Sequence, residues 1–260
     1  MVNTTLSNTV PRQFSTNYMI LIPNKNIPIK IIFEDGDIIA LNKPAGLPVY
    51  PLKGEETETL ANGLVAKWPE LASLGQDAGL VHRLDNDTSG IMLVAKNESA
   101  YKNLRKEFEN REVYKEYTAL VLGETPSDGI IDSPIVHDGK KMKIIPLSPK
   151  ERGRSQQKAH TEYKVIKKFL GGQYSLLKVI IKTGVRHQIR VHLASIGHPI
   201  AGDTLYCKSK HKLTDRTELN RQFLHASKIR FNHPSSGKLL ESESPLPREL
   251  ENVLTKLEAI

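Results

Sequence analysis

Apolar and polar positions first alternate regularly in residues 29–49, where two β-rich runs flank an Asp-Gly pair at 35–36. An Asp-Gly pair between such runs is a strong signal for a β-hairpin. The sequence KPAGLPV follows the second run, and its two prolines and one glycine predict a rigid loop. The pattern therefore predicts a hairpin followed by a rigid loop.

Spacing of three to four residues between large apolar side chains predicts two helices in the first half of the chain. Leu60, Leu64 and Trp68 form the apolar face of the first helix, and Pro69 ends it. Asn97 is a suitable N-cap for the second helix. The apolar face of that second helix is formed by Ala100, Tyr101, Leu104 and Phe108.

The second half of the chain contains further strand patterns and one short helix. Residues 112–123 predict a strand with one side formed by Val113, Lys115, Tyr117, Ala119 and Val121. Residues 161–184 predict a second hairpin that turns at the Gly-Gly pair at 171–172. Residues 187–199 predict a helix that ends near Gly197. The side chains of this helix that we expect to face inward are Ile189, Leu193 and Ile196.

Strands outnumber helices in this pattern, and hairpins outnumber β-α-β crossovers. The expected fold class is therefore α+β, with a central, mostly antiparallel mixed sheet flanked by helices and loops. The chain has 260 residues, of which 38% are hydrophobic, and that is enough for a sizeable core. We expect one domain over residues 29–255, preceded by a flexible amino-terminal tail over residues 1–28.

The overall composition limits the partners and the cellular compartment that we expect for the protein. Its formal net charge of +8 permits a polyanionic partner without requiring one. The single cysteine, Cys207, excludes an intramolecular disulfide and fits a reducing compartment. No apolar run approaches the roughly 20 residues that span a bilayer, and the first residues do not resemble a signal peptide. We therefore expect a cytoplasmic protein with no membrane partner.

Positive charge is concentrated between residues 138 and 168. This segment contains ten lysines and arginines but only three acidic residues. Among its basic residues we expect a polyanionic partner to contact Lys140, Lys141, Arg152 and Arg154. Phosphate contacts of this kind would make the affinity fall steeply with salt concentration. A solvated linker between two strands is the alternative interpretation.

A crowded polar stretch lies within the sequence GLVHRLDNDTSGIMLVAKN at residues 79–97. Its flanks, 78–81 and 90–95, have the pattern of strands, so the connection is longer than a turn requires. Arg83 and Asp85 are two positions apart, and in extended chain they would point to the same side. A nearby cation keeps a carboxylate ionised, as a base or nucleophile must be. Ordinary turn chemistry, with polar side chains bonded to nearby backbone, remains an alternative.

Other chemistries find less support in the sequence. His82 and Asp87 are candidate metal ligands, but nothing near them has the spacing of a zinc site, and we expect no metal. A glycosidase needs a second carboxylate, and no sequence feature singles one out. Neither of the glycine-rich phosphate-binding motifs GxxxxGK[ST] and GxGxxG occurs.

The sequence HRLDNDTSG at 82–90 resembles the signature HRLDxxTSG of the RluA-type family of RNA pseudouridine synthases, and it matches every fixed position. Four further stretches resemble blocks of that family: NKPAGLPV at 42–49, YKEYTALVLG at 114–123, TGVRHQIRVHLASIGHPIAGDTLY at 183–206, and LHASKIRFNHPSSGK at 224–238 with SPLP at 244–247. The blocks occur in family order and span roughly residues 30 to 250. Five ordered blocks make coincidence a poor explanation.

The resemblance implies the pseudouridine synthase catalytic fold and an isomerase. Such an enzyme detaches uracil from C1′ of a uridine in RNA, rotates the base and rejoins it through C5, without a metal or an organic cofactor. Asp85 matches the family's catalytic aspartate, which attacks either the ribose or the base. Arg83 matches the arginine that takes the place of the flipped nucleotide. Tyr117 matches the tyrosine that stacks on uracil and helps remove the C5 proton, and Arg190 matches the basic partner of the aspartate.

The resemblance also suggests how RNA is bound. Arg186 and His187 lie three or four positions before Arg190, and together with His82 they are expected to contact RNA. The polyanion expected at Lys140, Lys141, Arg152 and Arg154 is then also RNA. Val185 stands where many members have arginine, which puts the substrate preference in doubt. About thirty residues precede the first hairpin, so we expect no separate amino-terminal RNA-binding domain. The expected partner is a stem-loop of ribosomal or transfer RNA and not DNA, and the expected state is a monomer.

Two other classes of function remain open from the sequence. One is an RNA-binding protein of the same fold that no longer catalyses, although Asp85, Tyr117 and Arg190 are all present. The other is a hydrolase that uses Asp85 on a sugar or phosphate. A hydrolase releases free base, sugar or phosphate, whereas an isomerase releases none of them.

Overall fold

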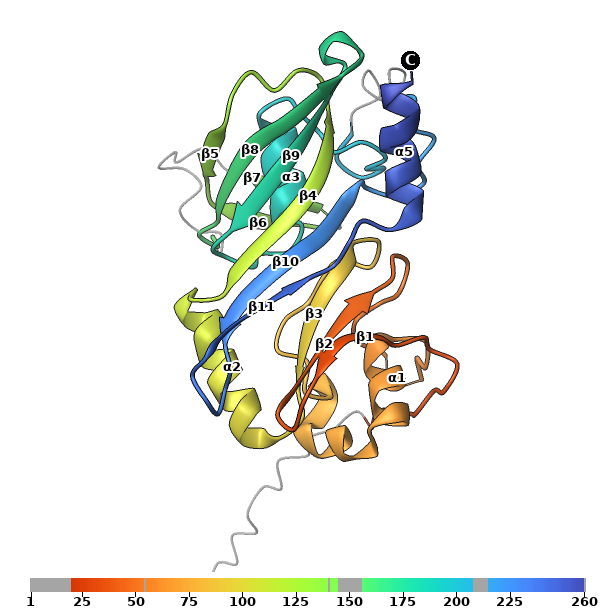
Figure 1. The fold of residues 1–260 in the computed structure, drawn as a ribbon, viewed down its shortest axis with the longest axis vertical. Coiled ribbons are helices and arrows are strands. Elements are labelled where there is room, and N and C mark those ends of the chain that lie inside the picture. Colours follow the sequence, from red (N-terminus) through yellow and green to blue (C-terminus); the bar gives the residue numbers. More distant parts are fainter. Residues whose placement is uncertain (1–19, 54, 140, 145–155, 208–214, 260) are drawn as a thin grey trace, which may run out of the picture.

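The computed structural model describes residues 20–53, 55–139, 141–144, 156–207 and 215–259 (Figure 1). Most of the expected amino-terminal tail therefore lies outside the described residues. Within the described part of the chain, no helix combines the length and apolarity that crossing a membrane would require.

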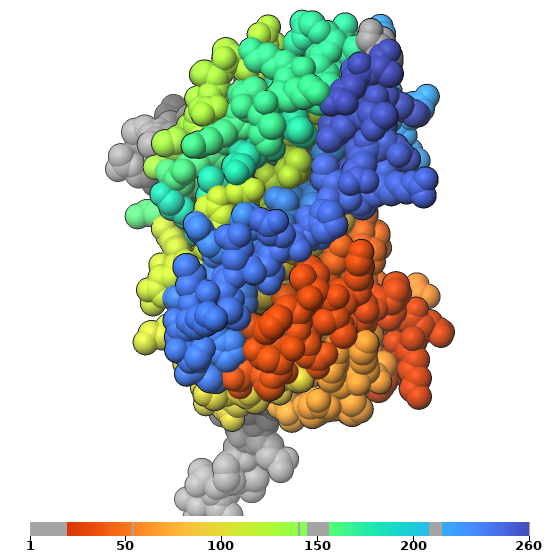
Figure 2. Space-filling view, in the orientation of Figure 1, coloured from red at the N-terminus to blue at the C-terminus, as the bar shows by residue number. Residues whose placement is uncertain are grey.

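A nine-stranded sheet forms the centre of the molecule, in the order β1-β2-β3-β10-β4-β9-β8-β5, with β11 also paired to β10 (Figure 1). In Figure 2 the C-terminal part of the chain, in blue, accordingly lies between the N-terminal part in red and orange and the middle part in green. Only β3 and β10 pair in parallel, and the other pairs in this sheet are antiparallel. The strands are β1 (Lys30–Glu34), β2 (Ile38–Lys43), β3 (Ser89–Ala95), β4 (Tyr114–Leu122), β5 (Gly129–Asp132), β8 (His160–Phe169), β9 (Tyr174–Ile181), β10 (Leu224–Asn232) and β11 (Leu239–Glu243). A separate hairpin pairs β6 (Ile135–Asp138) with β7 (Lys141–Ile144).

Helices cover both faces of this sheet, as expected for the α+β class. They are α1 (Leu60–Lys67), α2 (Glu98–Asn110), α3 (Gln188–Ser195) and α5 (Arg248–Glu258), with 3-10 turns η1 (Pro69–Asp77) and η3 (Leu170–Gly172). Asn97 caps α2 by accepting a hydrogen bond from the backbone N–H of Ala100, which confirms its predicted role. Both predicted hairpins are also present, as β1–β2 and β8–β9.

Strands β2 and β3 are buried on both faces, which explains their nearly continuous apolar sequences. Ile39 and Leu41 of β2 pack with α1 in the larger core cluster. Ile38 and Ala40 point the other way and pack in a second cluster with Leu104 of α2. Because side chains alternate along β2, one face of the sheet packs against α1 and the other face packs against α2.

The polar stretch ends at Ser89 and Gly90, where strands β3 and β10 approach each other closely. Gly90 has a φ of +121°, and a Cβ atom there would lie 2.2 Å from the carbonyl oxygen of Ala226. Ser89 Oγ lies 2.9 Å from Nδ1 of the buried His225. Position 90 therefore requires glycine, because any side chain there would collide with the backbone of β10. This contact fixes the register at which the polar stretch enters the sheet.

Two local predictions were wrong. Residues 78–81 do not form a strand: Ala78 and Gly79 have positive φ, so the chain turns there and only Leu80 bridges to β3. Ile196 does not face inward and is 38% exposed. Helix α3 ends at Ser195, so Ile196 no longer follows the helical face that buries Ile189.

Candidate active site

The loop between Leu84 and Ser89 is anchored through its backbone. The carbonyl oxygen of Asn86 accepts hydrogen bonds from Lys43 Nζ at 2.7 Å and from the backbone N–H of Gly46 at 2.9 Å. Arg221 donates to the carbonyl oxygen of Asp87 at 3.1 Å. Because other elements bind the loop backbone, the side chain of Asp85 is left to face a cavity.

Lys43 is a fully buried lysine that the sequence analysis did not select. Its Nζ donates to three carbonyl oxygens at 2.7–2.8 Å, those of Pro44, Leu47 and Asn86. Burial lowers the pKa of Lys43 to about 7, although the negative charge of nearby Asp87 opposes that change. Three carbonyl acceptors match the three N–H donors of an ammonium group. The KPAGLPV loop and the polar stretch are thus joined by one side chain.

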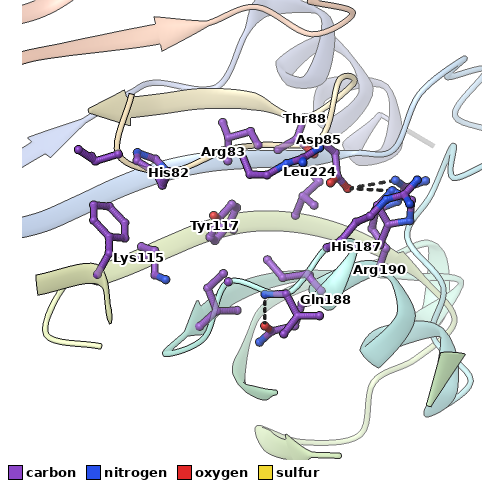
Figure 3. A pocket seen from close by; sticks show the side chains of 18 of the residues that line it. His82, Arg83, Asp85, Thr88, Lys115, Tyr117, His187, Gln188, Arg190 and Leu224 are labelled. Carbon is purple, nitrogen blue, oxygen red and sulfur yellow. Dashed lines mark hydrogen bonds and ion pairs between the residues drawn. The ribbon is translucent and has the colours of Figure 1, made fainter. Parts of the chain in front are cut away.

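Arg190 on α3 joins two aspartates that lie far apart in the sequence, and Figure 3 shows it beside the first of them, Asp85. Its Nη1 donates to Asp85 Oδ2 at 3.1 Å. Its Nε and Nη2 donate to the two oxygens of Asp203 at 2.7 and 3.0 Å. Asp203 is wholly buried, whereas the side chain of Asp85 is 17% exposed. Burial alone would lower the pKa of Arg190, but hydrogen bonding and charge from both aspartates raise it, so the guanidinium stays charged.

His187 also approaches Asp85. Its Nε2 lies 3.9 Å from Asp85 Oδ2, and its Nδ1 lies 2.9 Å from the hydroxyl of Tyr206. That hydroxyl already accepts a hydrogen bond from the backbone N–H of Met142, so it is free to donate to Nδ1. The arrangement favours the tautomer with its proton on Nε2, toward Asp85. Burial lowers the pKa of His187, opposed by the charge of Asp85.

Arg186 and His187, whose spacing from Arg190 suggested a shared helical face, both lie before the start of α3. His187 is the residue before the helix and has a φ of 55°, and Arg186 precedes it in the loop. Neither residue therefore occupies the i, i+3 or i, i+4 position of a helical face with Arg190. Arg186 is exposed, and its Nη1 lies 3.3 Å from Nε2 of His137.

Tyr117 lies on β4 in the same cavity as Asp85, a pocket of about 400 Å³ (Figure 3). The predicted alternation is confirmed, because Lys115, Tyr117 and Ala119 are all buried on this side of the strand. Burial, and then the negative charge of Asp85, raise the pKa of Tyr117, so the phenol is protonated at neutral pH. Its ring and hydroxyl are therefore neutral parts of the pocket wall.

Arg83 is exposed and forms no ion pair with Asp85, although the two residues are only two positions apart. It lines both the first pocket and a second hollow of about 1330 Å³, which is bordered by the KPAGLPV loop. Asp85, Arg186, His187 and Arg190 also line both hollows. Asp85 therefore lies where the two hollows meet, with Arg83 at the shared rim.

His82 belongs to the far wall of the first pocket. Its ring stacks on Phe108 at 4.8 Å between centroids, and its Nε2 accepts a hydrogen bond from the backbone N–H of Leu93. Burial, together with the charge of Lys115, lowers the pKa of His82 to about 3. A ring that is neutral at physiological pH brings no positive charge to RNA, although its expected contact with RNA stays a prediction.

Three of the basic residues expected to contact RNA, Lys140, Arg152 and Arg154, lie outside the described residues. Lys141 is described, and it is exposed at the start of β7. Across the residues that the structure covers, no cluster of three or more His, Cys, Asp or Glu side chains is placed to hold a metal ion.

Comparison with known proteins identifies the family. A family model described as RNA pseudouridylate synthase matches residues 37–195, which include the polar stretch, Tyr117 and Arg190. The chain belongs to the RNA pseudouridylate synthase family. This confirms the resemblance drawn from the five sequence blocks.

Curated members of the RNA pseudouridylate synthase family are similar over most of this chain. A protein of Nitrosomonas europaea named ribosomal large subunit pseudouridine synthase D is 40% identical over 235 residues, covering 88% of this chain and 65% of that protein. An uncharacterized RNA pseudouridine synthase of Chloroflexus aurantiacus is 42% identical over 221 residues, covering 84% and 66%. The chain thus spans about two thirds of the length of these two relatives.

Solved structures of the family share the fold. Human RNA pseudouridylate synthase domain containing 4 superposes with a TM-score of 0.66 at 25% identity, over 88% of this chain and 93% of that one. The human domain containing 1 gives a TM-score of 0.65 at 25% identity, over 92% and 98%. The expected pseudouridine synthase fold is therefore confirmed.

Proposed function

We propose that this protein is an RNA pseudouridine synthase, an isomerase that converts specific uridines in structured RNA to pseudouridine with Asp85 as the nucleophile. One observation carries the proposal: a carboxylate held by a buried arginine lies in a pocket with an aromatic side chain on the facing strand. Family membership supports the reaction type. The residues named below are assigned from their positions in this pocket.

The first step of the proposed reaction is flipping of the target uridine. A paired uridine is stacked in its helix, and extruding it costs a few kcal/mol. Arg83 is exposed at the rim where the two hollows meet, within reach of the RNA from which the base departs. A planar guanidinium stacks and donates hydrogen bonds at once, which suits the vacated place in the stem.

Chemistry would begin with attack of an Asp85 oxygen on ribose C1′ or on C6 of uracil. In the first route, the Asp85–C1′ bond forms as the C1′–N1 bond breaks, and uracil leaves as an anion. After rotation, C5 attacks C1′, Asp85 is released, the C5 proton is lost and N1 gains a proton. Arg190 binds the carboxylate of Asp85 and directs it at the pocket before attack, and Asp203 keeps Arg190 in place when the charge of Asp85 is consumed.

Tyr117 would form the surface on which the flipped uracil stacks. Its ring lies in the pocket wall, and among the described residues its hydroxyl has no hydrogen-bond partner. The protonated hydroxyl can therefore bind the substrate directly and assist removal of the C5 proton. This assignment agrees with the role that the resemblance implies for the tyrosine in the block YKEYTALVLG.

We propose ribosomal RNA as the substrate class, with transfer RNA as the second candidate and DNA excluded. The name of the Nitrosomonas relative supports ribosomal RNA. The protein would bind the RNA as a monomer through its single catalytic domain. Exposed basic residues around the site, Arg83 and Arg186 among them, would contact phosphates and make binding weaken with salt.

Replacement of Asp85 by Asn tests the proposal. A transcript of the large-subunit ribosomal RNA is incubated with purified protein, and pseudouridine is mapped by carbodiimide modification and primer extension. The wild type should form pseudouridine without releasing free uracil or sugar, and Asp85→Asn should form none while still binding RNA. Glu70→Gln, an exposed change on η1 outside both hollows, should behave as the wild type. Full activity of Asp85→Asn would contradict the mechanism, and free base would indicate a hydrolase.

A further inference from the structure

Lys115 is a second buried lysine, and it lies in the wall of the pocket that contains Asp85. It is 9% exposed. Its only hydrogen bond in the described part of the protein is a long one, 3.5 Å from Nζ to the carbonyl oxygen of Thr183. Its Nζ also lies 5.6 Å from the centroid of the Phe108 ring. Within the described residues, no carboxylate lies close enough to form an ion pair with it.

An ammonium group in such surroundings is costly unless a further acceptor arrives. Burial, and then the positive charge of Arg111, lower the pKa of Lys115 to about 8. By comparison, Lys43 has three close carbonyl acceptors. Lys115 therefore keeps N–H donors available inside the pocket, where a bound ligand can use them.

The position of Lys115 relative to Asp85 defines which part of a ligand it meets. Lys115 and Tyr117 project from the same side of β4, about 7 Å apart along the strand. Figure 3 shows Tyr117 between Lys115 and Asp85, so the three side chains follow one line through the pocket. A Cβ atom built at Gly184 would lie 4.0 Å from Lys115 Nζ, so the residue there leaves space beside the ammonium group.

We infer that Lys115 donates a hydrogen bond to the uracil carbonyl opposite the bond to ribose, which is O4 in uridine. The inference rests on the proposed function. A uracil stacked on Tyr117 with its ribose at Asp85 extends its C4 edge toward Lys115. Cytosine carries an amino group at this position, and two donors would then face each other. Lys115 therefore selects uracil over cytosine inside the pocket.

The same contact survives the rotation of the base. Turning uracil so that C5 replaces N1 at the ribose exchanges the positions of C2 and C4. O2 of pseudouridine then occupies the place that O4 held in uridine. A single donor at Lys115 is therefore satisfied both before and after the isomerisation, and it guides the detached base without favouring one orientation.

A phosphate group of the RNA is the other oxygen acceptor that a lysine could bind. Phosphates remain at the mouth of the site, where exposed arginines such as Arg83 and Arg186 are available. Lys115 is instead buried beside Phe108 and on the same side of the strand as Tyr117. The depth of its position favours the base.

The test combines Lys115→Met with a single-atom change in the RNA. The target nucleotide carries tritium at C5 and is either uridine or 4-thiouridine, whose sulfur is a weaker acceptor than oxygen. Tritium release is followed under single-turnover conditions, and RNA affinity is measured separately. Lys115→Met should be about 10- to 100-fold slower than wild type on uridine, with RNA affinity retained. Sulfur should slow the wild type but not Lys115→Met, because the sulfur atom and the methionine each remove the same hydrogen bond between Lys115 and the base.

Lys102→Met, on the exposed face of α2, is the matched control and should equal the wild type. Equal rates of Lys115→Met and wild type on uridine overturn the inference while leaving the proposed function standing. If Lys115→Met binds both RNAs more weakly and with a shallower salt dependence, Lys115 contacts a phosphate. That result also overturns the inference. If Lys115→Met does not fold, the wild-type rates on uridine and 4-thiouridine test the inference. Equal wild-type rates on the two RNAs overturn it. Failure of the wild type to form pseudouridine refutes the proposed function itself.

Discussion

The replacement Asp203→Asn tests how Arg190 is held in place. Asp203 is wholly buried and accepts four hydrogen bonds. Its Oδ2 accepts from Arg190 Nε, and its Oδ1 accepts from Arg190 Nη2 and from the backbone N–H groups of Leu205 and Tyr206. Asparagine has nearly the same shape, so the change removes the charge and one acceptor and leaves the volume almost unchanged.

The size of the effect follows from this geometry. An asparagine oxygen at the Oδ1 position satisfies three donors, and its NH₂ group then faces Arg190 Nε, donor against donor. Removing one partner of a buried ion pair costs roughly 3–5 kcal/mol, and the remaining contact with Asp85 keeps the loss near the lower end, about 3 kcal/mol. A displacement of Arg190 by about 1 Å would lower the rate about 100-fold.

Urea unfolding and single-turnover pseudouridine formation measure the two effects. Asp203→Asn should lower the free energy of unfolding by about 3 kcal/mol and also slow the reaction. Asp85→Asn should abolish the reaction with little loss of stability, because its side chain faces the pocket and is partly exposed. An Asp203→Asn protein as stable and as active as the wild type would refute the claim that Asp203 positions Arg190.

Two further predictions concern other buried groups. Tyr117→Phe keeps the stacking ring and should retain RNA affinity while slowing tritium release by about 100-fold; an unchanged rate would remove the hydroxyl from the mechanism. Burial lowers the pKa of His225 to about 4 from 6.5, so between these values the unfolded chain binds a proton that the folded chain does not. His225 should therefore contribute a loss of about 3 kcal/mol in the free energy of unfolding from pH 7 to pH 4, and His225→Gln should reduce the total fall by about this amount in urea titrations; an unchanged slope would contradict it.

Local patterns in the sequence were sufficient for most of the elements. Alternation identified β4 with its buried side, and an Asp-Gly pair identified the β1–β2 hairpin. Asn97 identified the start of α2. These features depend on contacts between residues close in the chain, so spacing alone reveals them. Where backbone conformation departs from the average, at Ala78 and after Ser195, the same patterns failed.

The sequence by itself determined the family through five ordered blocks, and with it the candidate aspartate, tyrosine and arginine. The sequence did not determine which residues hold these three side chains in position. Arg190 meets Asp85 across 105 positions, and Lys43 meets the carbonyl of Asn86 across 43. Such partners become neighbours only when the sheet and α3 assemble. The tertiary structure therefore decided the anchoring of Arg190 by Asp203 and the burial of Lys115 without an ion-pair partner among the described residues, because burial and charge pairing are properties of the packed chain and of no local segment.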